Sequence, residues 1–132
     1  MKFLYATLLV LIASALIACS HYTKATAKPT PDESYQSSMK RLDKEIKALI
    51  GSASCSSDSQ CHSIGFGHKP CGGFYAYRIY SDKNTNVNLL KSKVSRYNAL
   101  SREWNRKNQL ASNCMMLMQP QLACRNQTCQ IK

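Results

Sequence analysis

The chain has 132 residues, of which 18 are lysine or arginine and 7 are acidic, so its formal net charge is +11. A polypeptide of this size buries only about two-thirds of its unfolded surface, which excludes a large hydrophobic core as the sole source of stability. The positive charge favours acidic partners, such as anionic lipid, phosphate-bearing polysaccharide or an acidic protein.

The first twenty residues have the pattern of an export signal. Lys2 is followed by an apolar run over residues 3–18, which is shorter than the roughly 20 residues that span a bilayer. The sequence Leu16-Ile17-Ala18-Cys19 resembles the lipobox of bacterial lipoproteins cut by signal peptidase II. The resemblance implies that residues 1–18 are removed and that Cys19 is acylated, with palmitate or a similar chain. Ser20 after it resembles the signal for the outer membrane.

Two alternatives to lipidation remain at this point. Ordinary secretion would need cleavage after Ala15, with Ala13 and Ala15 as the small residues before the cut. A retained membrane anchor is the other. Cysteine parity favours lipidation, because the chain has seven cysteines and acylation of Cys19 leaves six for disulfides, which suit an oxidising envelope compartment.

Residues 19–31 form the predicted spacer, which contains His21 as a solvated linker residue and reaches at most roughly 40 Å. After cleavage the chain keeps 17 basic and 7 acidic side chains. Residues 32–132 fit a single domain. Nucleic acid is excluded as a partner by a location outside the inner membrane.

Residues 32–50 are predicted to form a helix, because Tyr35, Met39, Leu42, Ile46 and Leu49 make one apolar stripe. Residues 52–73 are rich in serine, glycine and cysteine and predict a loop with one short strand between residues 64 and 66. Residues 74–80 are aromatic and predict a strand. A second helix is predicted over 87–110 and a hairpin over 119–132.

The predicted class is therefore α+β, with two amphipathic helices and a small antiparallel sheet stapled by disulfides. Six cysteines allow 15 connectivities, and the sequence does not choose among them. Our proposed pairing joins Cys55 to Cys61 and Cys124 to Cys129 as local bridges, and Cys71 to Cys114 as the long-range one.

No motif predicts catalysis or a cofactor. A zinc site is one interpretation of the cluster Cys61, His62, His68 and Cys71. Exported cysteines oxidise, however, and the spacing matches no standard zinc-finger pattern. A nucleophile elbow, a phosphate loop and a pair of carboxylates are all missing from the sequence. The pattern Cys55-x-x-Asp58-x-x-Cys61 followed by Cys71-Gly72-Gly73 is similar to a recurrent small secreted bacterial module, and this likeness implies no function.

The candidate binding residues lie in and just after the loop Gly67–Gly73. Glycines flank the basic tip of this loop, and a disulfide at Cys71 would hold it in place. We expect Tyr75 and Tyr77 to face outward with Arg78 nearby, a combination suited to sugar or protein recognition. The candidates are His68, Lys69, Tyr75, Tyr77 and Arg78. A purely structural role for the glycines and aromatics is the alternative.

The sequence thus predicts a membrane-anchored envelope lipoprotein, facing the periplasm or the cell surface, that binds an anionic envelope component or protein without catalysis. The alternative is an inhibitor of a secreted hydrolase, a lysozyme or a protease, in which the Gly67–Gly73 loop blocks the enzyme. Neither the ligand nor the oligomeric state follows from the sequence.

Overall fold

The computed structural model describes residues 31–132, so the predicted signal sequence, Cys19 and nearly all of the predicted spacer lie outside the described residues. The elements follow in the order α2 (Pro31–Ile50), η1 (Asp58–Gln60), β1 (Cys61–His68), β2 (Phe74–Ser81), α3 (Val87–Lys107), β3 (Leu122–Arg125) and β4 (Thr128–Ile131). The predicted α+β class is confirmed, with two small antiparallel sheets in place of one.

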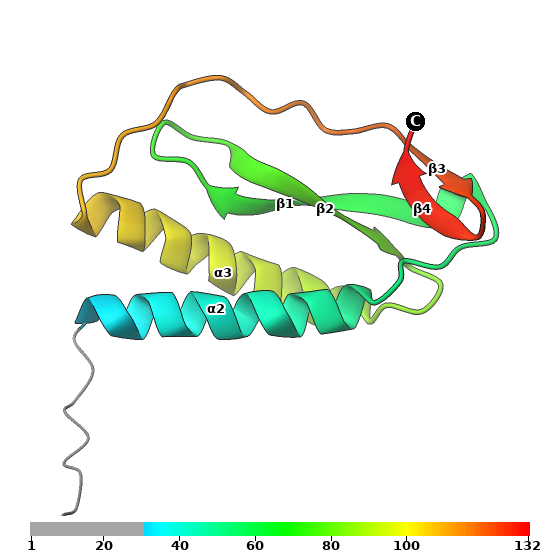
Figure 1. Cartoon of the computed structure of the whole chain (residues 1–132), viewed down its shortest axis with the longest axis horizontal. Helices are drawn as coiled ribbons and strands as arrows, with labels where there is room; N and C mark the ends of the chain where they lie inside the picture. The colour runs from blue at the N-terminus through cyan, green and yellow to red at the C-terminus, as the bar shows by residue number, and fades with distance from the viewer. Residues whose placement is uncertain (1–30) are drawn as a thin grey trace, which may run out of the picture.

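The two helices lie side by side on one face of the β1–β2 hairpin, with α3 against β1 and α2 against β2 (Figure 1). The segment 108–121, which we call the strap, runs from the end of α3 along the hairpin to β3. The β3–β4 hairpin lies at the end of the β1–β2 hairpin that is remote from its turn. Within residues 31–132, neither helix is long and apolar enough to cross a bilayer.

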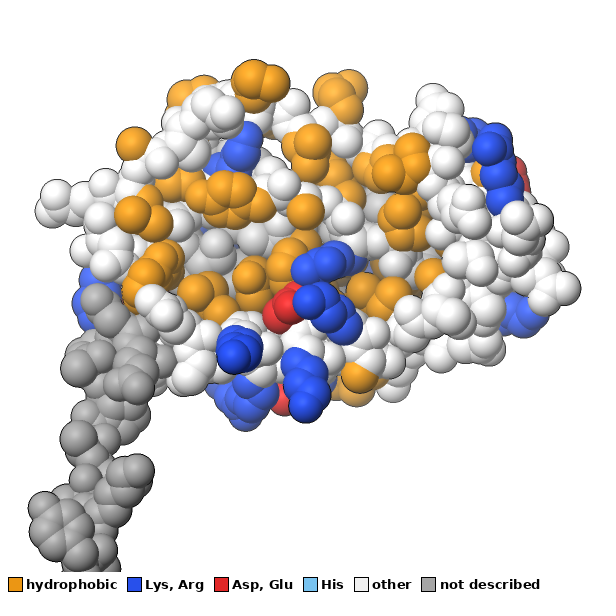
Figure 2. All heavy atoms as spheres, viewed as in Figure 1, with side chains coloured by type: hydrophobic (Ala, Val, Ile, Leu, Met, Phe, Trp, Pro, Cys, Tyr) orange, Lys and Arg blue, Asp and Glu red, His pale blue; other side chains and the backbone are white. Residues whose placement is uncertain are grey.

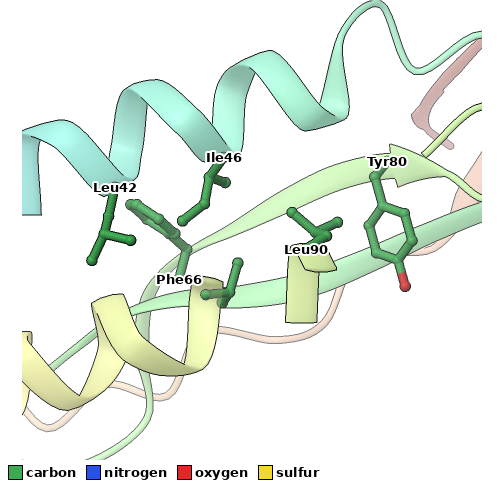
Figure 3. Close-up of a cluster of buried hydrophobic side chains, with 6 residues drawn as sticks. Leu42, Ile46, Phe66, Tyr80 and Leu90 are labelled. Atoms are coloured by element: carbon green, nitrogen blue, oxygen red, sulfur yellow. The ribbon is translucent and has the colours of Figure 1, made fainter. Parts of the chain in front are cut away.

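The apolar stripe predicted for the first helix does form the core. Leu42 and Ile46 of α2 are buried and point toward Phe66 of β1 (Figure 3). The cluster is completed by Tyr80, Leu90 and Val94. The helix stops at Ile50 because Gly51 takes a positive φ of 56°, a conformation that glycine adopts without a steric cost.

The second predicted helix is confirmed as α3, which ends at Lys107, three residues earlier than expected. Its first turn is capped by Asn86, whose side chain accepts a hydrogen bond from the Leu89 N–H at 3.1 Å. An ion pair of 2.6 Å between Lys93 and Glu45 links α3 to α2. The Lys93 hydrogen bond to Glu45 lowers the pKa of that carboxyl.

Strand β1 is longer than the sequence predicted. It runs over eight residues and pairs with β2 from Cys61 opposite Ser81 to His68 opposite Phe74. Glycines at 65 and 67 weaken the β signal of this stretch, which explains the underestimate. Gly65 is needed, because a Cβ there would lie 2.2 Å from the ring of Phe74.

The outer edge of β1 is closed by side chains of α3 instead of by a third strand. Asn98 accepts a hydrogen bond from the Gly67 N–H at 2.7 Å and donates to the Gly65 carbonyl at 3.0 Å. The Ser101 hydroxyl accepts from the His68 N–H at 3.0 Å and donates to the carbonyl of the same residue at 3.3 Å.

Asn105 also donates to the His68 carbonyl. We call Asn98, Ser101 and Asn105 the polar ladder, and all three are buried. Because unpaired buried backbone groups are costly, the ladder holds α3 in register with β1.

The six cysteines of the described domain form three disulfides, as expected, but two of the three predicted pairs are wrong. Cys55 bonds to Cys124 and Cys61 bonds to Cys129, while the predicted long-range bridge is confirmed. Cys124 and Cys129 are cross-strand neighbours in β3 and β4, but each sulfur bonds instead to a cysteine of the segment 55–61, onto which the hairpin packs.

Backbone hydrogen bonds dock the β3–β4 hairpin onto that segment. The Cys55 N–H donates to the Gln127 carbonyl at 3.0 Å, and the Cys129 N–H donates to the Ala53 carbonyl at 3.0 Å. The C-terminal hairpin is therefore attached to residues 53–61, far away in sequence, through both covalent and hydrogen bonds.

We predict that non-reducing peptide mapping will recover Cys55 linked to Cys124 and Cys61 linked to Cys129. The double variant Cys55→Ala/Cys124→Ala should lose about 4 kcal/mol of unfolding free energy, because the bridge closes a long loop in the unfolded chain. Denaturant titration measures the loss. Recovery of a peptide in which Cys55 is linked to Cys61 would contradict the fold.

The variant Asn98→Ala is predicted to lose about 3 kcal/mol of unfolding free energy, because it leaves a buried N–H and a buried carbonyl of β1 unpaired. Asn88→Ala, at an exposed site on the same helix, is the matched control and should change stability by less than about 0.5 kcal/mol. Equal effects of the two substitutions would show that the ladder does not hold α3 to the strand.

Candidate functional site

The polar ladder brings cationic side chains of α3 beside the loop that the sequence singled out. A hollow of about 460 Å³ lies between the start of the hairpin turn and the last turns of α3. Its lining is His68, Lys69, Pro70, Arg102, Asn105, Arg106, Gln109 and Leu110. Three of these residues carry permanent positive charge and none is acidic.

A second hollow of about 270 Å³ lies farther along α3, and Arg102 lines both. Its lining is Ile64, Gly65, Phe74, Lys91, Val94, Ser95, Asn98 and Arg102. We call the two together the basic groove. An aromatic ring and aliphatic side chains form part of its wall, and Lys91 adds a fourth cation at the far end.

The groove residues on α3 follow from helical spacing. Lys91, Ser95, Asn98, Arg102 and Asn105 recur at intervals of three or four, which places them on one side of the helix. The buried amides of this row bind the edge of β1 while the exposed cations flank them. Arg106 is also favourably placed near the carboxyl end of the helix, where the dipole attracts positive charge.

Of the candidate binding residues from the sequence, His68 and Lys69 line the groove. The His68 Nδ1–H donates to the Lys69 carbonyl at 2.9 Å, so the neutral ring keeps its lone pair on Nε2. The ammonium group of Lys69 donates to the Asn113 side-chain oxygen at 3.0 Å and to the Met115 carbonyl at 2.8 Å. Lys69 therefore holds the strap as well as lining the groove.

The other three predicted binding residues are not part of the groove. Tyr75 is half exposed, and Tyr77 is partly buried against Phe74, with the ring centroids 6.0 Å apart. Arg78 faces the helices: its guanidinium lies 4.5 Å from the centre of the Phe66 ring and donates to Asp43 at 2.9 Å. The contacts of Arg78 are therefore internal.

The histidines do not form a catalytic set with the serines of residues 34–132. His62 binds Asp82 at 3.0 Å on the surface near Tyr80, and no serine hydroxyl in that part of the chain is hydrogen-bonded to its ring. The sulfur atoms of Cys55, Cys61 and Cys129 lie close together, but they belong to two disulfides and are not thiolates.

No motif in the sequence singled out Arg102, Arg106 or Lys91 as binding residues. The helical spacing of these cations relative to Asn98 and Asn105 could have indicated the site, because two amides seven residues apart in the interior of a helix lie on one face. Comparison of the chain with protein-family models, curated proteins and solved structures found no match.

Proposed function

We propose that this protein is a non-catalytic binding module, held at a bacterial envelope membrane by acylated Cys19, whose basic groove binds an anionic envelope polymer. The observation that carries the proposal is the lining of the groove, which has Lys69, Arg102 and Arg106 at one end, Lys91 at the other and no carboxylate. Cations without a nearby acid favour phosphate or carboxylate groups.

The shape of the groove favours a chain-like ligand over a small one. Both hollows are open to solvent and share Arg102, so anionic groups on one polymer can contact both in turn. Phe74 offers an apolar wall that suits the face of a sugar ring. An acidic protein is the competing occupant, and a test with defined polyanions distinguishes it.

Cysteine pairing supports the proposed anchor. The three disulfides use six of the seven cysteines, and the seventh, Cys19, is the residue that the lipobox resemblance assigns to acylation. Stable membrane attachment needs two or more acyl chains, at about 0.8 kcal/mol for each buried methylene. The palmitate and outer-membrane assignments belong to the same proposal.

Inhibition of a secreted hydrolase is a second candidate function, because a disulfide-stapled segment with large apolar side chains lies beside the Gly67–Gly73 loop. This candidate uses a different surface from the groove.

The groove predicts salt-sensitive binding of inorganic polyphosphate or polygalacturonate to the detergent-extracted full chain. Arg102→Gln/Arg106→Gln should weaken binding at least about tenfold, because charge-assisted hydrogen bonds contribute about 1.5–3 kcal/mol each. Lys40→Gln/Lys44→Gln removes the same charge from α2, away from the groove, and should change affinity less than about threefold. Equal losses would indicate attraction to net charge alone.

Intact mass spectrometry of the membrane-extracted protein should show cleavage before Cys19, added acyl mass and six oxidised cysteines. The variant Cys19→Ser should lose the acyl mass and stay in an uncleaved or soluble form, because its sulfur is the attachment atom. Cys71→Ser/Cys114→Ser is the matched control and should keep the acyl mass. A mature chain that begins after Ala15 without added mass would contradict the anchor.

A further inference from the structure

The strap carries the largest run of exposed apolar side chains in the described residues. Met115, Met116, Leu117 and Met118 are 73%, 74%, 47% and 83% exposed. Figure 2 shows hydrophobic side chains along the upper margin of the molecule, where Figure 1 draws the strap. Solvated apolar side chains in succession are unusual unless they meet a partner.

The central part of the strap also lacks backbone partners. Within residues 31–132, residues 111–120 belong to no helix or strand and make no backbone–backbone hydrogen bond. A partner that presents a strand edge can therefore pair with this backbone while its pockets take alternate side chains. A lipid surface would take the apolar side chains but would offer no hydrogen-bond partners to the backbone between them.

Covalent and polar contacts hold the strap in place. Cys114, immediately before the four apolar residues, is bonded to Cys71 in the hairpin turn. On the far side, Gln119 donates to the Ser63 hydroxyl at 3.1 Å. Cys124 then ties the chain to Cys55.

Contacts from the hairpin turn add to this support. Lys69 donates to the Met115 carbonyl at 2.8 Å, and the Met116 sulfur lies 3.6 Å from the position that a Cβ on Gly73 would take. These contacts and the two disulfides restrict the strap before it binds, which reduces the entropy that it loses on binding.

We propose that residues 114–119 dock like a substrate into the active-site cleft of an extracytoplasmic endopeptidase whose pockets accept the large apolar side chains of Met116 and Met118. The proposal rests on the inhibitor function named above and moves the blocking segment from the Gly67–Gly73 loop to the strap. Lys69 acts as a positioning residue, because its ammonium holds the strap carbonyl and does not enter the enzyme.

The test measures inhibition of a chymotrypsin-type and a subtilisin-type endopeptidase by the detergent-extracted full chain, with a chromogenic peptide as substrate. Met116→Asp/Met118→Asp should raise the inhibition constant at least about 100-fold, because central apolar contacts dominate such interfaces. Leu89→Asp, at an exposed apolar site on α3, is the matched control and should leave the constant within about threefold. Inhibition of neither enzyme at ~10 µM protein overturns the proposal, as does an equal loss in both variants.

The Cys71–Cys114 disulfide provides a second measurement. Cys71→Ser/Cys114→Ser should turn the chain from an inhibitor into a substrate that the same enzyme hydrolyses between residues 114 and 119, as mass spectrometry of the fragments would show. Rapid cleavage of the wild-type strap would overturn the proposal. Arg102→Gln/Arg106→Gln should inhibit like the wild type, so that failure of inhibition and failure of polyanion binding are separate results.

Discussion

The hydrogen bonds between the polar ladder of α3 and the outer edge of β1 are the contacts on which the rest of the structure depends. A two-stranded hairpin by itself is marginally stable in water, and its open edge would leave backbone groups unpaired. Asn98 and Ser101 of α3 form hydrogen bonds with these backbone groups. In the same register of α3 against β1, Leu90 and Val94 are buried in the core. The ladder thus pairs the open edge of β1 and also fixes the position of α3 on the hairpin.

The disulfides add stability that a core of this size does not supply by itself. One of them, Cys71–Cys114, holds the start of the strap at the hairpin turn, and the other two hold the C-terminal hairpin at the opposite end. Between these attachments the backbone has no strand partner. Both ends of the strap are therefore fixed to the rest of the domain, while its methionines lie in solvent.

Two surfaces of opposite character result from these constraints. The basic groove lies between α3 and β1, while the apolar strap follows the hairpin from its turn toward β3. Lys69 touches both, because its side chain lines the groove and its ammonium holds the strap. The linear motif singled out Lys69, but it did not distinguish a contact to a ligand from a contact to another part of the chain.

The two helices, the aromatic strand, the C-terminal hairpin and the presence of disulfides could all be predicted from the sequence, because they follow from local periodicity, turn residues and cysteine parity. Tertiary structure alone decided the pairing of Cys55 and Cys61, the length of β1 and the inward position of Arg78, since each depends on which distant segment lies opposite. It also decided that Arg102 and Arg106 stand beside His68, because a helix and a strand more than thirty residues apart in the sequence are joined there by hydrogen bonds.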